Sequence, residues 1–264
     1  MTGPGEDRPR GSRRGLLLGG LALAGGYAGL RVGLPALHDR LGALDLEPLD
    51  SPPGFRRMAG GSVSRPGFDP FLGLEAEGED TAPPPAAIGD DLCAALFEDA
   101  ARVPGVVPIA YFSDYNCIYC RALSPRLAAM ARDRADIAIA WHELPLLGLS
   151  SVTAARAITA AEAQGAGQAF HEALMTSRAG TAPERLDALA RRLKIDPERL
   201  AADMTSPATE RALGRSRALS DLFGLIGTPA LVVGRTIVVG AISDMALDRL
   251  IARERRDGLI RACL

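Results

Sequence analysis

The sequence has little histidine, little cysteine and almost no net charge. Three histidines and four cysteines occur among its 264 residues, and no second cysteine pair or cysteine-histidine cluster exists. A structural zinc site needs four such ligands, so we expect no metal, and no motif requires a cofactor. The net charge of −2 gives no sign of a nucleic-acid-binding surface. Hydrophobic residues make up 47% of the chain, which is enough for one core with extensions.

The most informative motif is Cys117-Ile118-Tyr119-Cys120, which follows an apolar run, residues 106–112, and opens a helical pattern. The first cysteine of such a pair lies at a helix N-terminus, where unpaired N–H groups stabilise a thiolate. We therefore predict that Cys117 is a solvent-accessible nucleophile with a lowered pKa. Cys120, one helical turn further on, is predicted to be shielded and to resolve a mixed disulfide. Half of a zinc site or a structural disulfide are the alternatives, and the spacing favours redox chemistry.

A second motif, Gly227-Thr228-Pro229, stands immediately before an apolar run, residues 230–233. An X-Pro bond at the start of a strand suits a cis peptide bond. Because Pro229 lacks an N–H group, it leaves an edge free for pairing with another chain.

Three segments, residues 112–121, 143–148 and 227–230, together resemble the DsbA-like branch of the thioredoxin superfamily. The resemblance covers roughly residues 88 to 253. It implies an α/β, thioredoxin-like fold with an inserted helical subdomain, a cis Pro229 facing Cys117, and Thr228 in contact with the cysteine pair. It also implies thiol-disulfide exchange on exported protein substrates, and a membrane redox partner that recycles the pair. The substrate-binding residues would be Thr228, Pro229, Ile118 and Tyr119.

The chain departs from the best-known pattern of this family at two places. The dipeptide between the cysteines is Ile118-Tyr119 instead of Pro-His, and Tyr111 stands where a buried acid occurs. Without the histidine, Cys117 is expected to be less acidic and the couple less oxidising. Asp114 and Glu143 are candidate proton acceptors, although carboxylates near a loop are more often solvated or capping groups.

Three functions therefore stay open. The first is an exported thiol-disulfide oxidoreductase that works as an oxidase, and the second is the same chemistry run as a reductase or isomerase. The third is a redox-inert periplasmic chaperone or adaptor that only holds peptides. The intact pair Cys117/Cys120 and the loop at Pro229 argue against the third.

The N-terminal residues 1–30 are predicted to be an export signal or a membrane anchor. A basic segment, residues 8–14, precedes residues 15–30, which carry no charge. Arg13-Arg14 and the residues after it are similar to the twin-arginine consensus. The uncharged run is short for a membrane span, so a cleaved signal and an anchor both fit. The location implied is periplasmic, either soluble or tethered to the inner membrane.

Residues 31–87 are rich in proline and glycine and are predicted to be a tether between the membrane and the catalytic domain, residues 88–264. Within that domain, helices are expected over about residues 149–223, with helix starts at Asp196-Pro197 and Ser206-Pro207. A strand over residues 137–143, a hairpin over residues 230–239 and a last helix near residues 243–253 complete the pattern.

The remaining cysteines and the histidines have no role assigned by a motif. Cys93 and Cys263 either form a disulfide, which export would allow, or are separate thiols. His38, His142 and His171 are scattered, and each is expected to be a surface residue or a hydrogen-bonded core residue.

Overall fold

The computed structural model describes residues 44–66, 88, 91–98, 103–177 and 180–258. The expected signal or anchor, residues 1–30, lies outside this part of the chain, as do residues 31–43 and 67–87 of the expected tether, His38 and Cys263. Among the described helices, none is long and apolar enough to cross a membrane.

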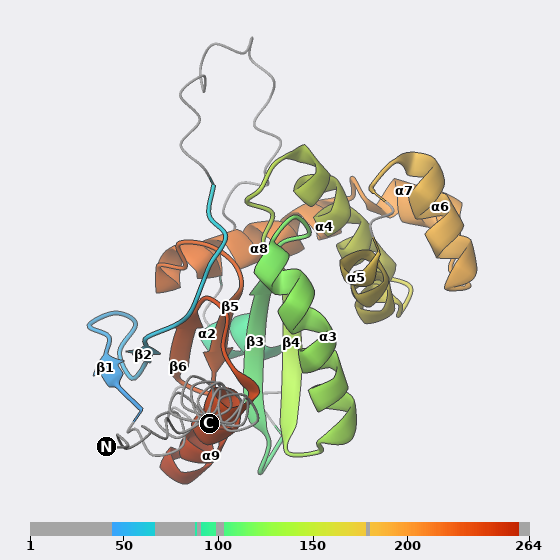
Figure 1. The fold of residues 1–264 in the computed structure, drawn as a ribbon. Helices are drawn as coiled ribbons and strands as arrows, with labels where there is room; N and C mark the ends of the chain where they lie inside the picture. Colours follow the sequence, from blue (N-terminus) through green and yellow to red (C-terminus); the bar gives the residue numbers. More distant parts are fainter. Residues whose placement is uncertain (1–43, 67–87, 89–90, 99–102, 178–179, 259–264) are drawn as a thin grey trace, which may run out of the picture. The chain divides into compact units, whose positions relative to one another are not determined.

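The described strands form one mixed sheet in the order β1-β2-β6-β5-β3-β4 (Figure 1). The strands are β1 (Leu46–Pro48), β2 (Arg56–Met58), β3 (Val107–Ser113), β4 (Ile137–Glu143), β5 (Ala230–Val233) and β6 (Thr236–Val239). Strand β3 lies parallel to β4 and antiparallel to β5, and β5 and β6 form the predicted hairpin. Its turn has a positive φ of 55° at Gly234, as the predicted glycine-first turn requires.

Four helices cover the two faces of the sheet, because successive side chains of a strand point to opposite sides. Val107, Ile109 and Tyr111 of β3 face α3 (Ile118–Asp133) and α9 (Asp244–Asp257). Ala110 and Phe112 face α2 (Leu92–Phe97) and α8 (Pro207–Phe223). The loop after β3 leads directly into α3, so the cysteine motif lies where a buried strand meets a helix.

A group of helices is inserted between β4 and β5 (Figure 1). It comprises α4 (Leu149–Glu162), α5 (Gly167–Thr176), α6 (Pro183–Arg192), α7 (Pro197–Asp203) and the start of α8. Most of these helices contribute to an apolar cluster separate from the sheet core, which includes Phe170, Leu186 and Leu200. Asp196 and Ser206 cap α7 and α8 as predicted, since each accepts a hydrogen bond from a backbone N–H group of the first turn. The predicted α/β fold with a helical insertion is thereby confirmed.

The prediction of a tether over residues 31–87 is wrong for residues 44–66. Strand β2 pairs in parallel with β6, and β1 pairs with β2, so this segment extends the sheet. Phe55 is buried, with its ring 4.8 Å from that of Phe223, and Arg56 binds Glu254 and Asp257 at 2.5 and 2.8 Å. The proline and glycine content concealed this docking, because the partners of Phe55 and Arg56 lie far away in the sequence.

Candidate functional site

Cys117 is the N-cap residue of α3. Its φ and ψ of −73° and 115° are extended, and its Sγ accepts a hydrogen bond from the N–H group of Cys120 at 3.0 Å. The N–H group of Cys117 donates to the carbonyl of Asp114 at 3.1 Å, which closes the loop after β3. The sulfur therefore takes the place of a capping oxygen, where the N–H groups of the first helical turn favour a negative charge.

The two cysteines have opposite acidities. A hydrogen bond from the Cys120 side chain is the largest cause that lowers the pKa of Cys117 to about 6; burial opposes it, and hydrogen bonds from Thr228 and Ser64 assist it. Burial, and then the hydrogen bond with Cys117 and the charge of Cys117, raise the pKa of Cys120. Both cysteines are free in this structure. At neutral pH the site thus holds one thiolate and one thiol, as the motif predicted.

The predicted accessibility of Cys117 is wrong, because this residue is 0% exposed, as is Cys120. Met175 of α5 packs against both cysteines, together with Leu147 and Tyr119. By contrast Ile118, the first residue of the dipeptide, is 67% exposed. The dipeptide therefore presents one apolar side chain to solvent, while Cys117 beside it is covered.

The predicted contact between the two motifs is confirmed. The Thr228-Pro229 bond is cis, and the Sγ of Cys117 lies 3.3 Å from the carbonyl oxygen of Thr228. The edge expected to be free at Thr228 is paired, however. Thr228 exchanges two backbone hydrogen bonds with Ser64, of 2.7 and 2.9 Å, in an isolated antiparallel bridge.

Asp114 is buried beside the motif and holds loops together. One of its carboxylate oxygens accepts hydrogen bonds from the N–H group of Asn116 and the hydroxyl of Ser151, at 2.7 and 2.6 Å. The other accepts from the N–H groups of Leu146 and Leu147, at 2.6 and 3.0 Å. Four donors occupy this carboxylate, so the loop after β4 is fixed against the loop that carries Cys117.

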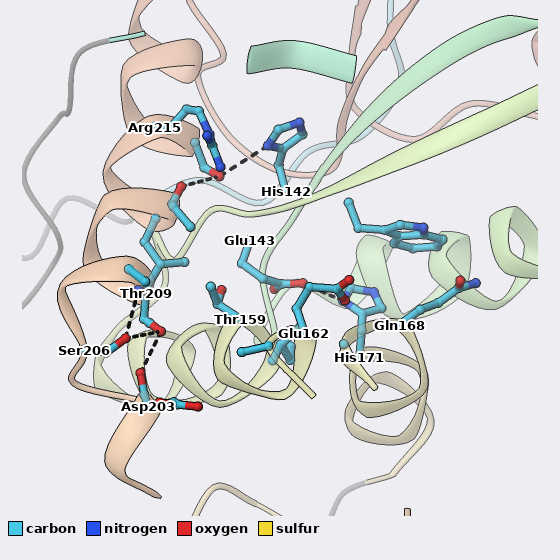
Figure 2. A pocket seen from close by; sticks show the side chains of 18 of the residues that line it. His142, Glu143, Thr159, Glu162, Gln168, His171, Asp203, Ser206, Thr209 and Arg215 are labelled. Carbon is cyan, nitrogen blue, oxygen red and sulfur yellow. Dashed lines mark hydrogen bonds and ion pairs between the residues drawn. The ribbon is translucent and has the colours of Figure 1, made fainter. Parts of the chain in front are cut away.

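Glu143 belongs to a buried chain of polar groups. Its Oε1 lies 2.6 Å from Nδ1 of His171, whose Nε2 lies 3.1 Å from the hydroxyl of Ser124. The Ser124 hydroxyl lies 2.9 Å from that of Tyr111. Figure 2 shows Glu143 from β4 and His171 from α5 pointing toward one another. The sequence reveals none of these contacts, because Ser124 and His171 come from helices whose approach is set by packing.

Tyr111 joins this chain to the cysteine pair. Burial, and then the charge and a hydrogen bond of Cys120, raise the pKa of the Tyr111 hydroxyl. At the other end, Glu143 and His171 line a pocket of about 600 Å³ beside β4 (Figure 2). The polar chain thus runs from the buried thiol of Cys120 to a cavity on the side of the helical insertion.

Of the remaining sequence candidates, His142 and His171 are buried and hydrogen-bonded, as expected of core residues. Cys93 is buried and disulfide-bonded. Whether its partner is Cys263, a pairing that the sequence left open, is not tested, because residue 263 lies outside the described part. Among the described residues, no group of three or more histidine, cysteine, aspartate or glutamate side chains is placed to hold a metal ion.

Comparison with known proteins gives one family match and several structural neighbours. Residues 108–252 match the model of the DSBA-like thioredoxin domain family. A thioredoxin-like oxidoreductase from Silicibacter pomeroyi is 32% identical, with a TM-score of 0.57, over 62% of this chain and 98% of that one. A periplasmic thioredoxin-like protein from Salmonella enterica serovar Typhimurium is 27% identical, with a TM-score of 0.53, over 65% and 99% of the two chains.

A curated protein, the Na(+)/H(+) antiporter NhaA 3 of Salinispora tropica, is 27% identical over 139 residues. The match covers 51% of this chain but only 21% of the antiporter.

Proposed function

The chain belongs to the DSBA-like thioredoxin domain family of thiol-disulfide oxidoreductases, and from this premise we propose that it is an exported oxidase of protein thiols. The observation that carries the proposal is the position of Cys117. Its sulfur caps α3 and lies 3.3 Å from the Thr228 carbonyl, with the buried Cys120 one turn further on. A reductase or isomerase would use the same residues, so the direction of electron flow is part of the proposal.

In the oxidase direction, the cycle begins with a disulfide between Cys117 and Cys120. A substrate thiolate attacks the Sγ of Cys117, a mixed disulfide forms, and Cys120 leaves and takes up a proton. A second substrate thiolate then attacks the substrate sulfur of the mixed disulfide and releases Cys117 as a thiolate. A pKa of about 6 makes Cys117 a good leaving group at neutral pH. The substrate loses two electrons, and the enzyme pair gains them.

Reoxidation needs a redox partner with a disulfide, which we propose is in the membrane. Cys117 attacks that disulfide, and Cys120 then attacks Cys117 and releases the partner as a dithiol. Because the pKa of Cys120 is raised, its thiol must give up a proton in this step. We propose that the buried polar chain accepts this proton. In this chain, Tyr111, Ser124 and His171 connect Cys120 to Glu143. Asp114 is a weaker candidate, because four donors already occupy its carboxylate.

Protein substrates are proposed to bind as an extended segment along Thr228 and Pro229, where main-chain groups can pair with any sequence. Three large apolar side chains in the segments near Cys117, Thr228 and the loop after β4 are exposed. Ile118 is 67% exposed beside Cys117, Ile226 is 54% exposed two residues before Thr228, and Leu149 is 70% exposed next to the loop that Asp114 holds. We propose that these side chains, together with Tyr119, contact the apolar residues that an unfolded protein segment exposes.

The periplasm is the proposed location. The similar Salmonella protein is described as periplasmic, and the basic segment of residues 8–14 followed by the uncharged residues 15–30 is typical of an export signal. An export signal that is cleaved and one that stays as an anchor are both compatible with this location.

Two cysteine variants test the function. Cys117→Ser is expected to abolish oxidation of a reduced peptide that carries two cysteines, because the nucleophile is gone. Cys120→Ser is expected to accumulate mixed disulfides with exported proteins, visible as reducible bands on a gel. Equal activity of Cys117→Ser and the unmodified protein would instead favour a redox-inert chaperone. The reduction potential of the pair decides the direction, since a reductase requires a value near that of thioredoxin.

The proton path has its own test. Glu143→Gln is expected to slow reoxidation and to move its pH profile, while the rate at which Cys117 first attacks a disulfide stays unchanged. Glu162→Gln is the matched control, because Glu162 lines the same pocket but is exposed and outside the polar chain. If both variants reoxidise like the unmodified protein, Glu143 takes no part in the proton transfer.

A further inference from the structure

Residues 59–66, here called the strap, cross the end of the sheet beside the cysteine pair. They leave β2 at Met58, and the carbonyl of Ser62 accepts a hydrogen bond from the N–H group of Ala241 at 2.8 Å. Ser64 then pairs with Thr228 through both of its backbone groups, at 2.7 and 2.9 Å. A Cβ atom at Gly227 would lie only 2.3 Å from the carbonyl oxygen of Ser64, so the two backbones are in close contact.

This pairing uses the main-chain groups that an extended substrate would need. Thr228 offers one N–H group and one carbonyl group at the edge, and Ser64 binds both of them. The carbonyl oxygen of Thr228 is also the one that lies 3.3 Å from the Sγ of Cys117. Ser64 is therefore placed next to the nucleophile, in the antiparallel arrangement by which a peptide strand is added to a sheet edge.

We propose that the strap is an intramolecular pseudosubstrate: it occupies the peptide-binding edge at Thr228, and a protein substrate reaches Cys117 only after displacing it. This inference rests on the proposed function and adds regulation to the same site. The strap thus covers Cys117 from the side of Thr228, in addition to Met175, Leu147 and Tyr119, and Cys117 is 0% exposed. Residue 64 thus occupies the position opposite Thr228 that a residue of a bound substrate would take.

The strap is held weakly enough to be displaced. Val63 and Ser64 are half-buried, and residues 59–62 and 65–66 are exposed. In the described part of the chain no ion pair holds the strap, whereas Arg56 anchors the preceding strand to two carboxylates. The strap can therefore leave Thr228 while β2 stays on the sheet. Only molecules with an open strap bind substrate. The apparent affinity therefore equals the intrinsic affinity multiplied by the fraction of molecules in which the strap is open.

The position of Ser64 is tested by cross-linking. In a Cys120→Ser background, Ser64→Cys places a thiol opposite Thr228, and oxidised glutathione is the oxidant. Cys117 attacks glutathione disulfide and releases one glutathione; the new thiol then attacks Cys117 and releases the second, which leaves a bond between positions 64 and 117. Peptide mapping should find this bond. The control Ser62→Cys, two residues earlier on the strap, should cross-link far more slowly, and equal cross-linking of the two variants would refute the proposed register.

The blocking role is tested by a proline. Ser64→Pro removes the N–H group that binds the Thr228 carbonyl, whereas Ser62→Pro leaves both bonds of Ser64 in place because Ser62 binds through its carbonyl. Ser64→Pro should raise the rate of Cys117 alkylation by iodoacetamide, and of oxidation of a reduced two-cysteine peptide, by about five- to tenfold, as expected for one lost hydrogen bond. Ser62→Pro should keep the blocked behaviour. Thermal unfolding checks that all variants fold.

The outcomes separate this inference from the proposed function. If the unmodified protein and Ser64→Pro both oxidise the peptide, and at the same rate, the strap does not block the site although the enzyme is an oxidase. If Cys117 in Ser64→Pro is readily alkylated but oxidises nothing, the strap inference holds and the proposed oxidase function fails. If alkylation and oxidation both rise in Ser64→Pro and not in Ser62→Pro, both are supported.

Discussion

At the scale of single residues, the two thiols of the site differ in acidity because of their positions on α3. Cys117 takes the N-cap of α3 and receives hydrogen bonds, whereas Cys120 lies inside the first turn, and both are buried. The histidine that the family often carries in the dipeptide is absent here, yet the pKa of Cys117 is lowered to about 6, chiefly by the Cys120 side chain. The hydrogen bonds around the sulfur therefore replace a charged neighbour as the source of thiolate stabilisation.

The rate of Cys117 alkylation is expected to follow this pKa. It should rise by about tenfold per pH unit below the midpoint, reach half of its maximum near pH 6, and level off above it, because only the thiolate reacts. Cys120→Ala should move the midpoint upward by more than Ser64→Ala does, since the hydrogen bond from Cys120 is the largest cause of the lowered pKa. Mass spectrometry of the alkylated peptide measures both shifts. A midpoint above pH 8 would contradict the stabilisation inferred here.

At the scale of elements, the sheet of the catalytic domain carries a two-strand addition, β1 and β2, at the edge formed by β6. Arg56 of β2 is the main polar anchor. Its guanidinium binds Glu254 at 2.5 Å, Asp257 at 2.8 Å and the hydroxyl of Thr236 at 2.7 Å, and Glu254 is 3% exposed. Because Glu254 is buried, loss of the arginine would leave a carboxylate without its cationic partner.

Replacement of Arg56 by glutamine is therefore expected to lower the free energy of unfolding by about 3 kcal/mol, the usual cost of breaking one side of a buried ion pair. Arg217→Gln is the matched control, because Arg217 and Asp221 are an exposed pair within α8. That change should cost less than about 0.5 kcal/mol. Urea unfolding of both variants gives the comparison, and equal losses would show that Arg56 does not anchor β2.

At the scale of the whole molecule, the sequence predicts the parts of the fold that depend on local pattern. The strand at residues 137–143 and the hairpin at residues 230–239 follow from alternation and a glycine turn, and the cysteine and Thr-Pro motifs identify both halves of the site. The contact between these two motifs was predicted from the family resemblance, but the other contacts between distant segments were not predictable. The docking of residues 44–66 depends on carboxylates in α9, and three-residue strands carry too little pattern to be recognised.

His142 connects three elements of the molecule, β4, α2 and α8, through a neutral ring. It lies on β4 and stacks on Phe112 at 4.7 Å; its Nε2 donates to the carbonyl of Leu96 in α2 at 2.8 Å, and its Nδ1 lies 3.4 Å from the hydroxyl of Ser216 in α8. Burial is the main cause that lowers its pKa from 6.5 to about 4, opposed by the hydrogen bond to Leu96. The folded protein thus requires the uncharged ring over most of the physiological pH range.

This requirement predicts how the whole molecule responds to acid. Between pH 6.5 and about 4, the unfolded chain binds a proton at His142 that the folded chain does not bind. The free energy of unfolding therefore falls as the pH falls through this window. Below about pH 4, His142 causes no further change. The loss amounts to roughly 3 kcal/mol at pH 4, at 1.36 kcal/mol per pKa unit. His142→Gln retains a donor for the Leu96 carbonyl but cannot titrate, so its free energy of unfolding should depend less on pH across the same window. Urea unfolding from pH 4 to pH 8 measures both proteins, and parallel curves would exclude His142 as the group that makes the fold sensitive to acid.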